Sequence, residues 1–263
     1  MSDQNLESLG AGICPIVIIK AHRAVVVKVR RVLFWAPLLA LVLTTGCKQT
    51  TLFESNFEAN TVNQPPSAAQ KVGTASIVGD PGSVVVVTAP ADAAPPTKWL
   101  RLRRATTVGD TTPADLPMFQ GNMTQAPGNG KYTFSTLMYM PLETNNVASI
   151  QFGTQNQPFG VFVGFFHLDF LKDNRMRIDD DERTIFGKFP RNQPFMVQVT
   201  LDVTNTSAKA HIILVGAGTE GQADRDVFGA LRLRGNFGSV RIFMGNPFTG
   251  EFNVANVLVT RNN

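Results

Sequence analysis

The chain has 263 residues, of which 43% are hydrophobic, so it can form one large globular domain or two small ones. Its net charge of +4 arises mostly near the N-terminus. Five of its 24 Lys and Arg residues and two of its 20 Asp and Glu residues precede Cys47, which leaves 19 and 18 after it, a net charge of +1. A nucleic-acid-binding domain would carry a clustered basic excess, so the sequence predicts no nucleic-acid partner.

The N-terminal segment has the layout of an export signal. Basic residues Lys28, Arg30 and Arg31 precede the apolar, uncharged stretch 32–43. This length suits the hydrophobic region of a signal peptide and is short for a membrane span. The following residues, Leu43-Thr44-Thr45-Gly46-Cys47, resemble the bacterial lipobox, although Thr44 stands where that motif usually has Leu.

The lipobox resemblance implies transfer of a diacylglyceryl group to the Cys47 thiol and cleavage after Gly46. Two or three acyl chains then give stable membrane anchoring. Lys48, directly after the cysteine, favours the outer membrane, so we expect an exported protein that is lipid-anchored to the cell envelope there. The alternative is a plain signal anchor, with Cys47 buried in the bilayer.

These features predict three parts of the chain. Residues 1–46 would be an N-terminal extension and signal peptide, with a signal-peptide helix within 25–46, the signal proper. Residues 47–51 would be the lipid-anchored tether, and residues 52–263 the folded domain. Acylation of Cys47 would also remove the one thiol of the mature chain, because Cys14 precedes the cleavage site.

Alternating apolar and polar residues, separated by turn residues, recur after the tether. The clearest alternation spans 195–203, and only 221–230 is a candidate for a short helix. About a dozen strands at this spacing predict one all-β domain, an antiparallel two-sheet β-sandwich. The expected strands are 52–58, 75–78, 83–88, 98–103, 131–140, 149–152, 161–166, 167–171, 175–178, 184–189, 195–203, 208–215, 238–244 and 252–260.

Three segments give this domain a resemblance to concanavalin A-like (laminin G-like) jelly rolls. Residues 53–58 look like their opening strand, 168–203 like their central sheet, and 252–260 like their last strand, which typically pairs beside the first. The resemblance implies two curved sheets, the concave one often holding saccharide. That family includes lectins, carbohydrate-binding modules, lyases, glycosidases and adhesion modules, so the fold does not choose a function.

Catalytic motifs of this fold are missing from the sequence. Glycosidases need two carboxyl groups at a defined separation, and the jelly-roll signature Glu-x-Asp-x-x-Glu does not occur. Glu54 and Glu58 lack the middle Asp, and Tyr132 and Tyr139 lie too early for the Tyr-rich late strand of alginate-lyase-like enzymes. We therefore predict no catalytic residues, with a polysaccharide lyase or glycosidase-like enzyme as the alternative.

No metal site or cofactor is predicted either. His167 and His211 lack Cys, Asp or Glu partners at metal-ligand spacing. The acidic run 179–182 offers the oxygen ligands that Ca²⁺ prefers, but consecutive residues in a turn rarely converge on one ion. We interpret this run as a solvated hairpin tip.

Two groups of residues are candidates for ligand binding. Polar side chains alternate across a tight predicted hairpin and could meet sugar hydroxyls on one sheet face, or form a solvated outer face; they are His167, Asp169, Arg175 and Arg177. Aromatic rings that could stack on a sugar are Trp99, Tyr132 and Tyr139, whereas the many Phe residues are expected in the core. The basic stretches 101–104 and 232–234 could meet anionic glycans or lipid head groups, or form ordinary surface charge.

The leading hypothesis is thus a lipid-anchored envelope protein that binds a glycan or another envelope component without catalysis. Its partners would be the membrane, through lipid on Cys47, and a glycan or envelope protein. The alternatives are a carbohydrate-active enzyme and a structural envelope lipoprotein without a small ligand.

Overall fold

The structure is a computed structural model of the chain. It describes residues 49–80, 82–90, 93, 96–104, 116–125, 128–142, 147–154, 164–204, 208–226, 237–245 and 249–262. Residues Lys48–Asn263 form one compact unit, distinct from Met1–Cys47. The predicted signal peptide and Cys47 lie outside the described residues. Within those residues, no helix is long and apolar enough to cross a bilayer.

All regular elements of the described residues are β-strands. They are β1 (Gln49–Ser55), β2 (Thr74–Val78), β3 (Val84–Thr88), β4 (Lys98–Arg104), β5 (Met118–Asn122), β6 (Gly130–Tyr139), β7 (Ala148–Thr154), β8 (Gly164–Phe170), β9 (Met176–Ile178), β10 (Asp181–Phe186), β11 (Pro194–Val203), β12 (Ala208–Val215), β13 (Gln222–Asp226), β14 (Phe237–Met244) and β15 (Gly250–Asn262).

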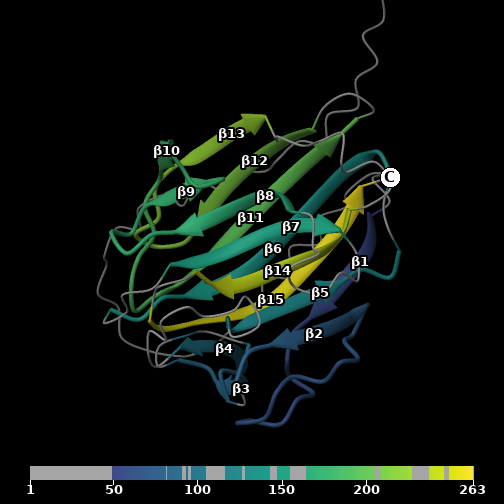
Figure 1. The fold of residues 1–263 in the computed structure, drawn as a ribbon, viewed down its shortest axis with the longest axis vertical. Helices are drawn as coiled ribbons and strands as arrows, with labels where there is room; N and C mark the ends of the chain where they lie inside the picture. Colours follow the sequence, from purple (N-terminus) through teal and green to yellow (C-terminus); the bar gives the residue numbers. More distant parts are fainter. Residues whose placement is uncertain are drawn as a thin grey trace, which may run out of the picture. The chain divides into compact units, whose positions relative to one another are not determined.

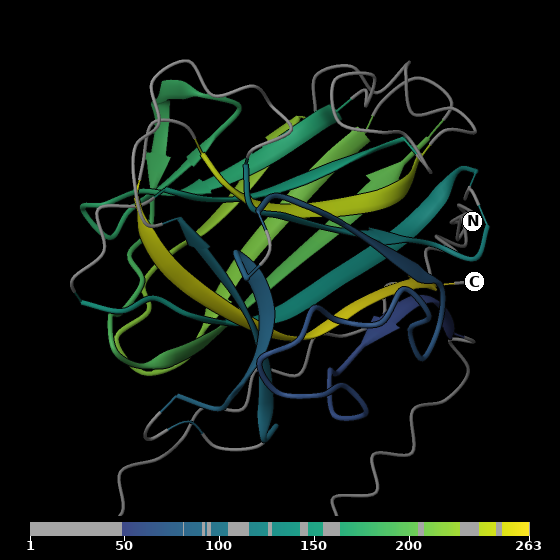
Figure 2. The ribbon, with the colours of Figure 1, turned by 60° about the horizontal axis from the view of Figure 1, so that its bottom comes forward.

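The strands form two antiparallel sheets. The eight-stranded sheet has the order β13-β12-β11-β6-β15-β4-β3, with β1 also paired to β15, and the seven-stranded sheet has the order β10-β9-β8-β7-β14-β5-β2. Both orders run from the top to the bottom of Figure 1. In Figure 2 the two sheets are seen as separate layers. The two yellow strands, β14 and β15, belong to different sheets. This arrangement confirms the predicted antiparallel two-sheet sandwich.

The core between the sheets follows from the period of two along each strand. In β11, the apolar side chains from Phe195 to Val203 alternate with the polar or half-exposed ones that face outward. Aromatic rings fill the middle: the Phe152 ring of β7 lies 5.3 Å from that of Phe134 in β6 and 5.5 Å from that of Phe166 in β8. The expected placement of Phe residues in the core is confirmed for the largest fully buried ones, namely Phe53, Phe57, Phe119, Phe134, Phe152, Phe166, Phe170, Phe189, Phe195 and Phe252.

The first and last strands pair, as the jelly-roll resemblance implies. β1 begins at Gln49, which lies opposite Asn262 of β15, so the sheet starts three residues before the expected boundary at Leu52. The Gln49 side chain donates a hydrogen bond to Thr260 Oγ1 at 2.8 Å. Residues 49–51 therefore belong to β1, because they pair with residues 260–262 of β15.

Three strands differ in kind from the sequence-based expectation. Residues Gly164–Phe170 form the single strand β8, where two strands, 161–166 and 167–171, were expected. Residues Gln222–Asp226, within the candidate helix 221–230, form the edge strand β13 instead. Their backbone pairs with the edge of β12, which a helix could not do. Strand β5 was not predicted because all five of its residues are buried, which removes the alternation. Its Gly121 is required by close packing: a Cβ there would lie 2.7 Å from the Phe53 ring.

The aromatic contact between the sheets predicts a large effect of Phe152→Ala. Removing this fully buried ring should lower the free energy of unfolding by about 3–5 kcal/mol, through lost burial and the cavity left behind. The control Leu142→Ala removes a side chain that is 66% exposed and should change it by less than about 0.5 kcal/mol. Urea denaturation measures both. Equal effects of the two substitutions would contradict the assigned core.

Candidate functional site

A row of polar side chains crosses the outer face of the seven-stranded sheet. Its members are directly opposite one another in the β-ladders, from β2 to β8: Ser76, Gln120, Arg241, Gln151 and His167. Opposite residues of an antiparallel pair project to the same face. Their chain neighbours Phe119, Ile242 and Ile150 belong to the core, so the polar row faces away from it. We call these five residues the polar row.

Hydrogen bonds fix the central side chains of the polar row. Arg241 and Gln120 are only 2% and 3% exposed. Arg241 Nε donates to Gln120 Oε1 at 2.7 Å, and Gln120 Nε2 donates to Asn122 Oδ1 at 2.7 Å. Asn122 Nδ2 in turn donates to Ser76 Oγ at 3.4 Å. Burial lowers the pKa of Arg241 to about 10, which still leaves its guanidinium charged at neutral pH.

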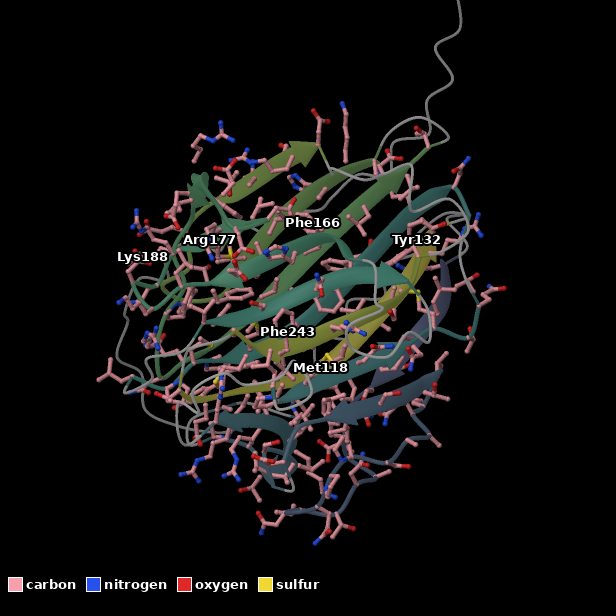
Figure 3. All side chains as sticks on the ribbon, in the orientation of Figure 1. Met118, Tyr132, Phe166, Arg177, Lys188 and Phe243 are labelled. Atoms are coloured by element: carbon pink, nitrogen blue, oxygen red, sulfur yellow. The ribbon has the colours of Figure 1, made fainter. Side chains whose placement is uncertain are left out.

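An apolar pair lies beside the polar row. Phe243 of β14 stands directly opposite Met118 of β5, on the same outer face. Figure 3 marks both near the middle of this sheet, with Arg177 farther toward β9. Phe243 is half-buried and Met118 is buried. An apolar ring next to planar amide groups can hold a sugar, whose C–H face is apolar and whose hydroxyls form hydrogen bonds.

A cluster of charged groups surrounds Arg177 at the β8–β9 end of the same face. Arg177 Nη2 lies 3.0 Å from Asp169 Oδ2 and 2.7 Å from Asp180 Oδ1, and Arg177 Nη1 lies 2.6 Å from Glu182 Oε1. Ser149 Oγ donates to Asp169 Oδ1 at 2.6 Å. We call His167, Asp169, Arg177, Asp180 and Glu182 the charged cluster. One guanidinium thus binds three carboxylates.

The turn between β9 and β10 completes this cluster. Ile178 pairs with Asp181, so Asp179 and Asp180 form a two-residue loop, with φ of 53° and 58°. Two consecutive positive φ values are typical of a type I′ hairpin turn, and Asp tolerates that conformation better than most residues. The Asp179 carboxylate accepts a hydrogen bond from the His167 backbone N–H at 2.9 Å. The acidic run therefore folds back onto β8 and is more than a solvated tip.

Burial dominates the titration of Asp169. Desolvation raises the pKa of this carboxyl, and the opposing hydrogen bonds from Ser149 and Arg177 do not cancel that effect. Burial alone would lower the pKa of Arg177, but hydrogen bonds to Asp169 and Glu182 outweigh it and raise the pKa. The guanidinium of Arg177 is therefore the fixed charge around which the carboxyl groups are arranged.

The structure brings together three of the four hairpin residues that the sequence singles out. Asp169 and Arg177 are opposite partners in the ladder, and His167 Nε2 lies 3.7 Å from Asp169 Oδ2. Arg175 instead lies in the turn before β9, where it binds Asp173, with Nη2 at 2.5 Å from Oδ2. Arg175 is thus not a member of the charged cluster.

The three candidate stacking rings differ in exposure. Trp99 is fully buried, and its Nε1 donates to the Pro96 carbonyl at 3.1 Å. Tyr132 is 1% exposed, packs edge-on against Phe237 at 5.6 Å, and donates its hydroxyl to the Gly128 carbonyl. Protein atoms cover both rings, so neither has a free face for a sugar. Tyr139 is half-buried and is thus the one of the three that is not fully covered.

Three members of the charged cluster also have the composition of a metal site. Ligand atoms of His167, Asp169 and Asp180 lie within 4.8 Å of one another. Sequence spacing did not reveal this group because Asp180 comes from the turn after the next strand. However, Arg177 already bonds both carboxylates and supplies the positive charge that an ion would bring.

Sequence reasoning missed the centre of the polar row. Arg241 lies between Val240 and Ile242 and is the one charged residue of β14, and such a lone charge was the signal that could have identified it. Gln120 lies in β5, which the alternation did not predict. Both residues are buried, so an expectation that polar side chains of a sheet are exposed does not find them.

Comparisons with known proteins add structural neighbours only. Neither models of protein families nor curated protein sequences match this chain. Similar solved structures include lectin II from Ulex europaeus (15% identity, 81% of this chain and 100% of that chain, TM-score 0.49) and arcelin-5, a lectin-like defense protein from Phaseolus vulgaris (11%, 81% and 97%, 0.44). Another is the Trypanosoma rangeli sialidase, of which this chain covers 31% (13% identity, 81% of this chain, TM-score 0.45). At such identities and TM-scores, these likenesses carry no function over to this chain.

The raised pKa of Asp169 predicts a pH dependence. Folding favours the protonated form of the Asp169 carboxyl, because its pKa is higher in the folded than in the unfolded chain. The stability that this preference contributes is fully present below the ordinary pKa of 3.8. It is lost as pH rises through the pKa of the folded state. In Asp169→Asn this loss is absent. The unfolding free energy of the variant, relative to the parent, should therefore increase between about pH 3 and pH 7. Urea denaturation across this range measures it, and a relative decrease would mean that the Arg177 pair outweighs burial.

Proposed function

We propose that this protein binds a glycan without catalysis at the outer face of its seven-stranded sheet, and that lipid on Cys47 holds it in the cell envelope. The observation that carries the binding proposal is the polar row. A sandwich needs apolar side chains only on the inner faces of its sheets, and burying polar groups costs free energy unless they are hydrogen-bonded. Gln120 and Arg241 are themselves covered and bonded, so they hold the row in place, and the half-buried Gln151 and His167 are members that a ligand can reach.

The chemistry of this face suits a sugar. Amide side chains offer both donors and acceptors, and a guanidinium offers several donors in one plane, which matches neighbouring hydroxyl groups. Gln151 and His167 are half-buried at one end of the polar row, and Ser76 is exposed at the other. Phe243, half-buried two residues after Arg241 on the same face, supplies an apolar surface for the C–H face of the sugar ring.

The state of the carboxylates supports binding over catalysis. A glycosidase uses one carboxyl as the acid and another as base or nucleophile. In the charged cluster, Asp169, Asp180 and Glu182 each bind Arg177, and Asp169 also accepts from Ser149. All three carboxyl groups are thus bound by one guanidinium, and none stands apart as the separate acid or base that a glycosidase needs.

Gln151→Ala tests the proposed binding face. The best-binding glycan from an array is titrated against the purified protein by calorimetry. Loss of the Gln151 hydrogen bonds should weaken binding about tenfold, equivalent to about 1.4 kcal/mol. The matched control Gln198→Ala removes a half-exposed Gln from the outer face of the other sheet and should leave binding unchanged.

Three results would reject this function. Absence of binding to every glycan on the array would contradict glycan binding. Equal weakening by Gln151→Ala and Gln198→Ala would contradict binding at the outer face of the seven-stranded sheet. Degradation of the bound glycan by the purified protein would replace binding by enzymatic activity.

Cys47→Ser tests the anchor. In bacteria producing the full chain, this substitution should abolish incorporation of labelled fatty acid, because the thiol is the acceptor of the diacylglyceryl group. The control Cys14→Ser should retain the label, because residue 14 precedes the proposed cleavage site. Label that persists in Cys47→Ser would refute lipid attachment at this residue.

A further inference from the structure

A second row of polar side chains lies on the outer face of the eight-stranded sheet. Arg101 of β4 stands directly opposite Asn253 of β15, which stands opposite Tyr139 of β6. These three strands are β6, β15 and β4, adjacent in the sheet order and near the centre of Figure 1. Their chain neighbours Leu100 and Val254 belong to the core, so this row faces outward.

Two atoms of this second row lack hydrogen bonds. Asn253 is only 5% exposed, and its Oδ1 is buried without a partner within the described residues. Arg101 Nε is likewise buried without a partner there. An unsatisfied buried polar group costs about 1–3 kcal/mol, and native structures contain few of them. Two such atoms on opposite residues indicate a place where a further molecule completes the bonding.

The neighbouring arginine on the same strand face provides a contrast. Arg103 Nε lies 3.9 Å from Glu251 Oε2, and the Arg103 side chain is 54% exposed. No carboxylate of the described residues pairs with Arg101. The fold therefore compensates the charge of Arg103 internally and leaves that of Arg101 available to an anion.

We propose that Arg101, Asn253 and Tyr139 bind a uronic acid residue of an acidic polysaccharide. The guanidinium of Arg101 matches a carboxylate, to which it can donate two parallel hydrogen bonds. Asn253 Oδ1 needs a donor, which a sugar hydroxyl supplies. Tyr139, half-buried and opposite Asn253 on the same face, supplies an aromatic ring for the C–H face of the sugar.

A simple anion fits this row less well. Sulfate would satisfy Arg101 but would give Asn253 Oδ1 no donor, and neither sulfate nor phosphate would use the Tyr139 ring. A neutral sugar would leave the Arg101 charge uncompensated. Only a ring that carries both a carboxylate and hydroxyls meets all three side chains. This site is separate from the polar row and does not depend on it.

The test compares charged and neutral forms of one glycan. Tetragalacturonate and tetraglucuronate, each with its methyl ester as the uncharged form, are titrated against the purified full-length protein by calorimetry. At least one acid should bind about tenfold or more tightly than its ester. Arg101→Gln should abolish this preference, whereas the control Arg103→Gln, with the same change in net charge, should retain it. Tyr139→Leu should weaken the acid and the ester together.

Additional variants keep the result unambiguous. If Arg101→Gln does not fold, Asn253→Asp places a carboxylate opposite Arg101, and the resulting pair should likewise abolish the acid preference. Gln151→Ala should leave uronate binding unchanged, which separates this site from the polar row. Absence of binding to both acids, or equal loss in Arg101→Gln and Arg103→Gln, would overturn the proposal.

Discussion

The contact between Phe134 and Phe152 joins the two sheets, and it marks the inward side from which the alternation along β6 and β7 runs. Their ring centroids lie 5.3 Å apart with perpendicular planes, and each ring is buried. Because side chains alternate along a strand, an inward Phe152 turns Gln151 outward, and an inward Phe134 turns Tyr139 outward. A shift of one residue in either strand would move the core residues to the surface. The same packing that stabilises the sandwich thus determines which polar groups its outer faces present.

The two outer faces use buried polar groups differently. On the seven-stranded sheet, Arg241, Gln120 and Asn122 bond to one another, so this face is held in one arrangement before a ligand arrives. On the eight-stranded sheet, Arg101 Nε and Asn253 Oδ1 have no partner among the described residues, so that row is incomplete by itself. Pre-organised groups favour affinity because little freedom is lost on binding, whereas the unsatisfied groups gain the bonds that the fold does not supply. Both arrangements fit the proposed binding of glycans.

The sequence predicted strands wherever one face is buried and the other is not, as in β11. It missed β5, in which every side chain is buried, and it left 221–230 as a candidate helix where β13 pairs with the edge of β12. The grouping of His167, Asp169 and Arg177 was predictable because the hairpin is local. The burial of Trp99 and Tyr132 was not, because alternation assigns a residue to a face and does not reveal what covers that face. Arg241 and Asp180 reach the site through pairings between distant strands and through a turn, which sequence spacing does not encode.

The binding face of the seven-stranded sheet can be located directly by nuclear magnetic resonance. The side-chain amide signals of Gln151 and Gln120 are followed while the best-binding glycan is added to the protein, with Gln198 of the other sheet as an internal reference. We expect the signals of Gln151 and Gln120 to shift in proportion to occupancy, while the Gln198 signal stays constant. Unchanged signals of Gln151 and Gln120 at saturation, with or without a shift of Gln198, would contradict glycan binding at the polar row.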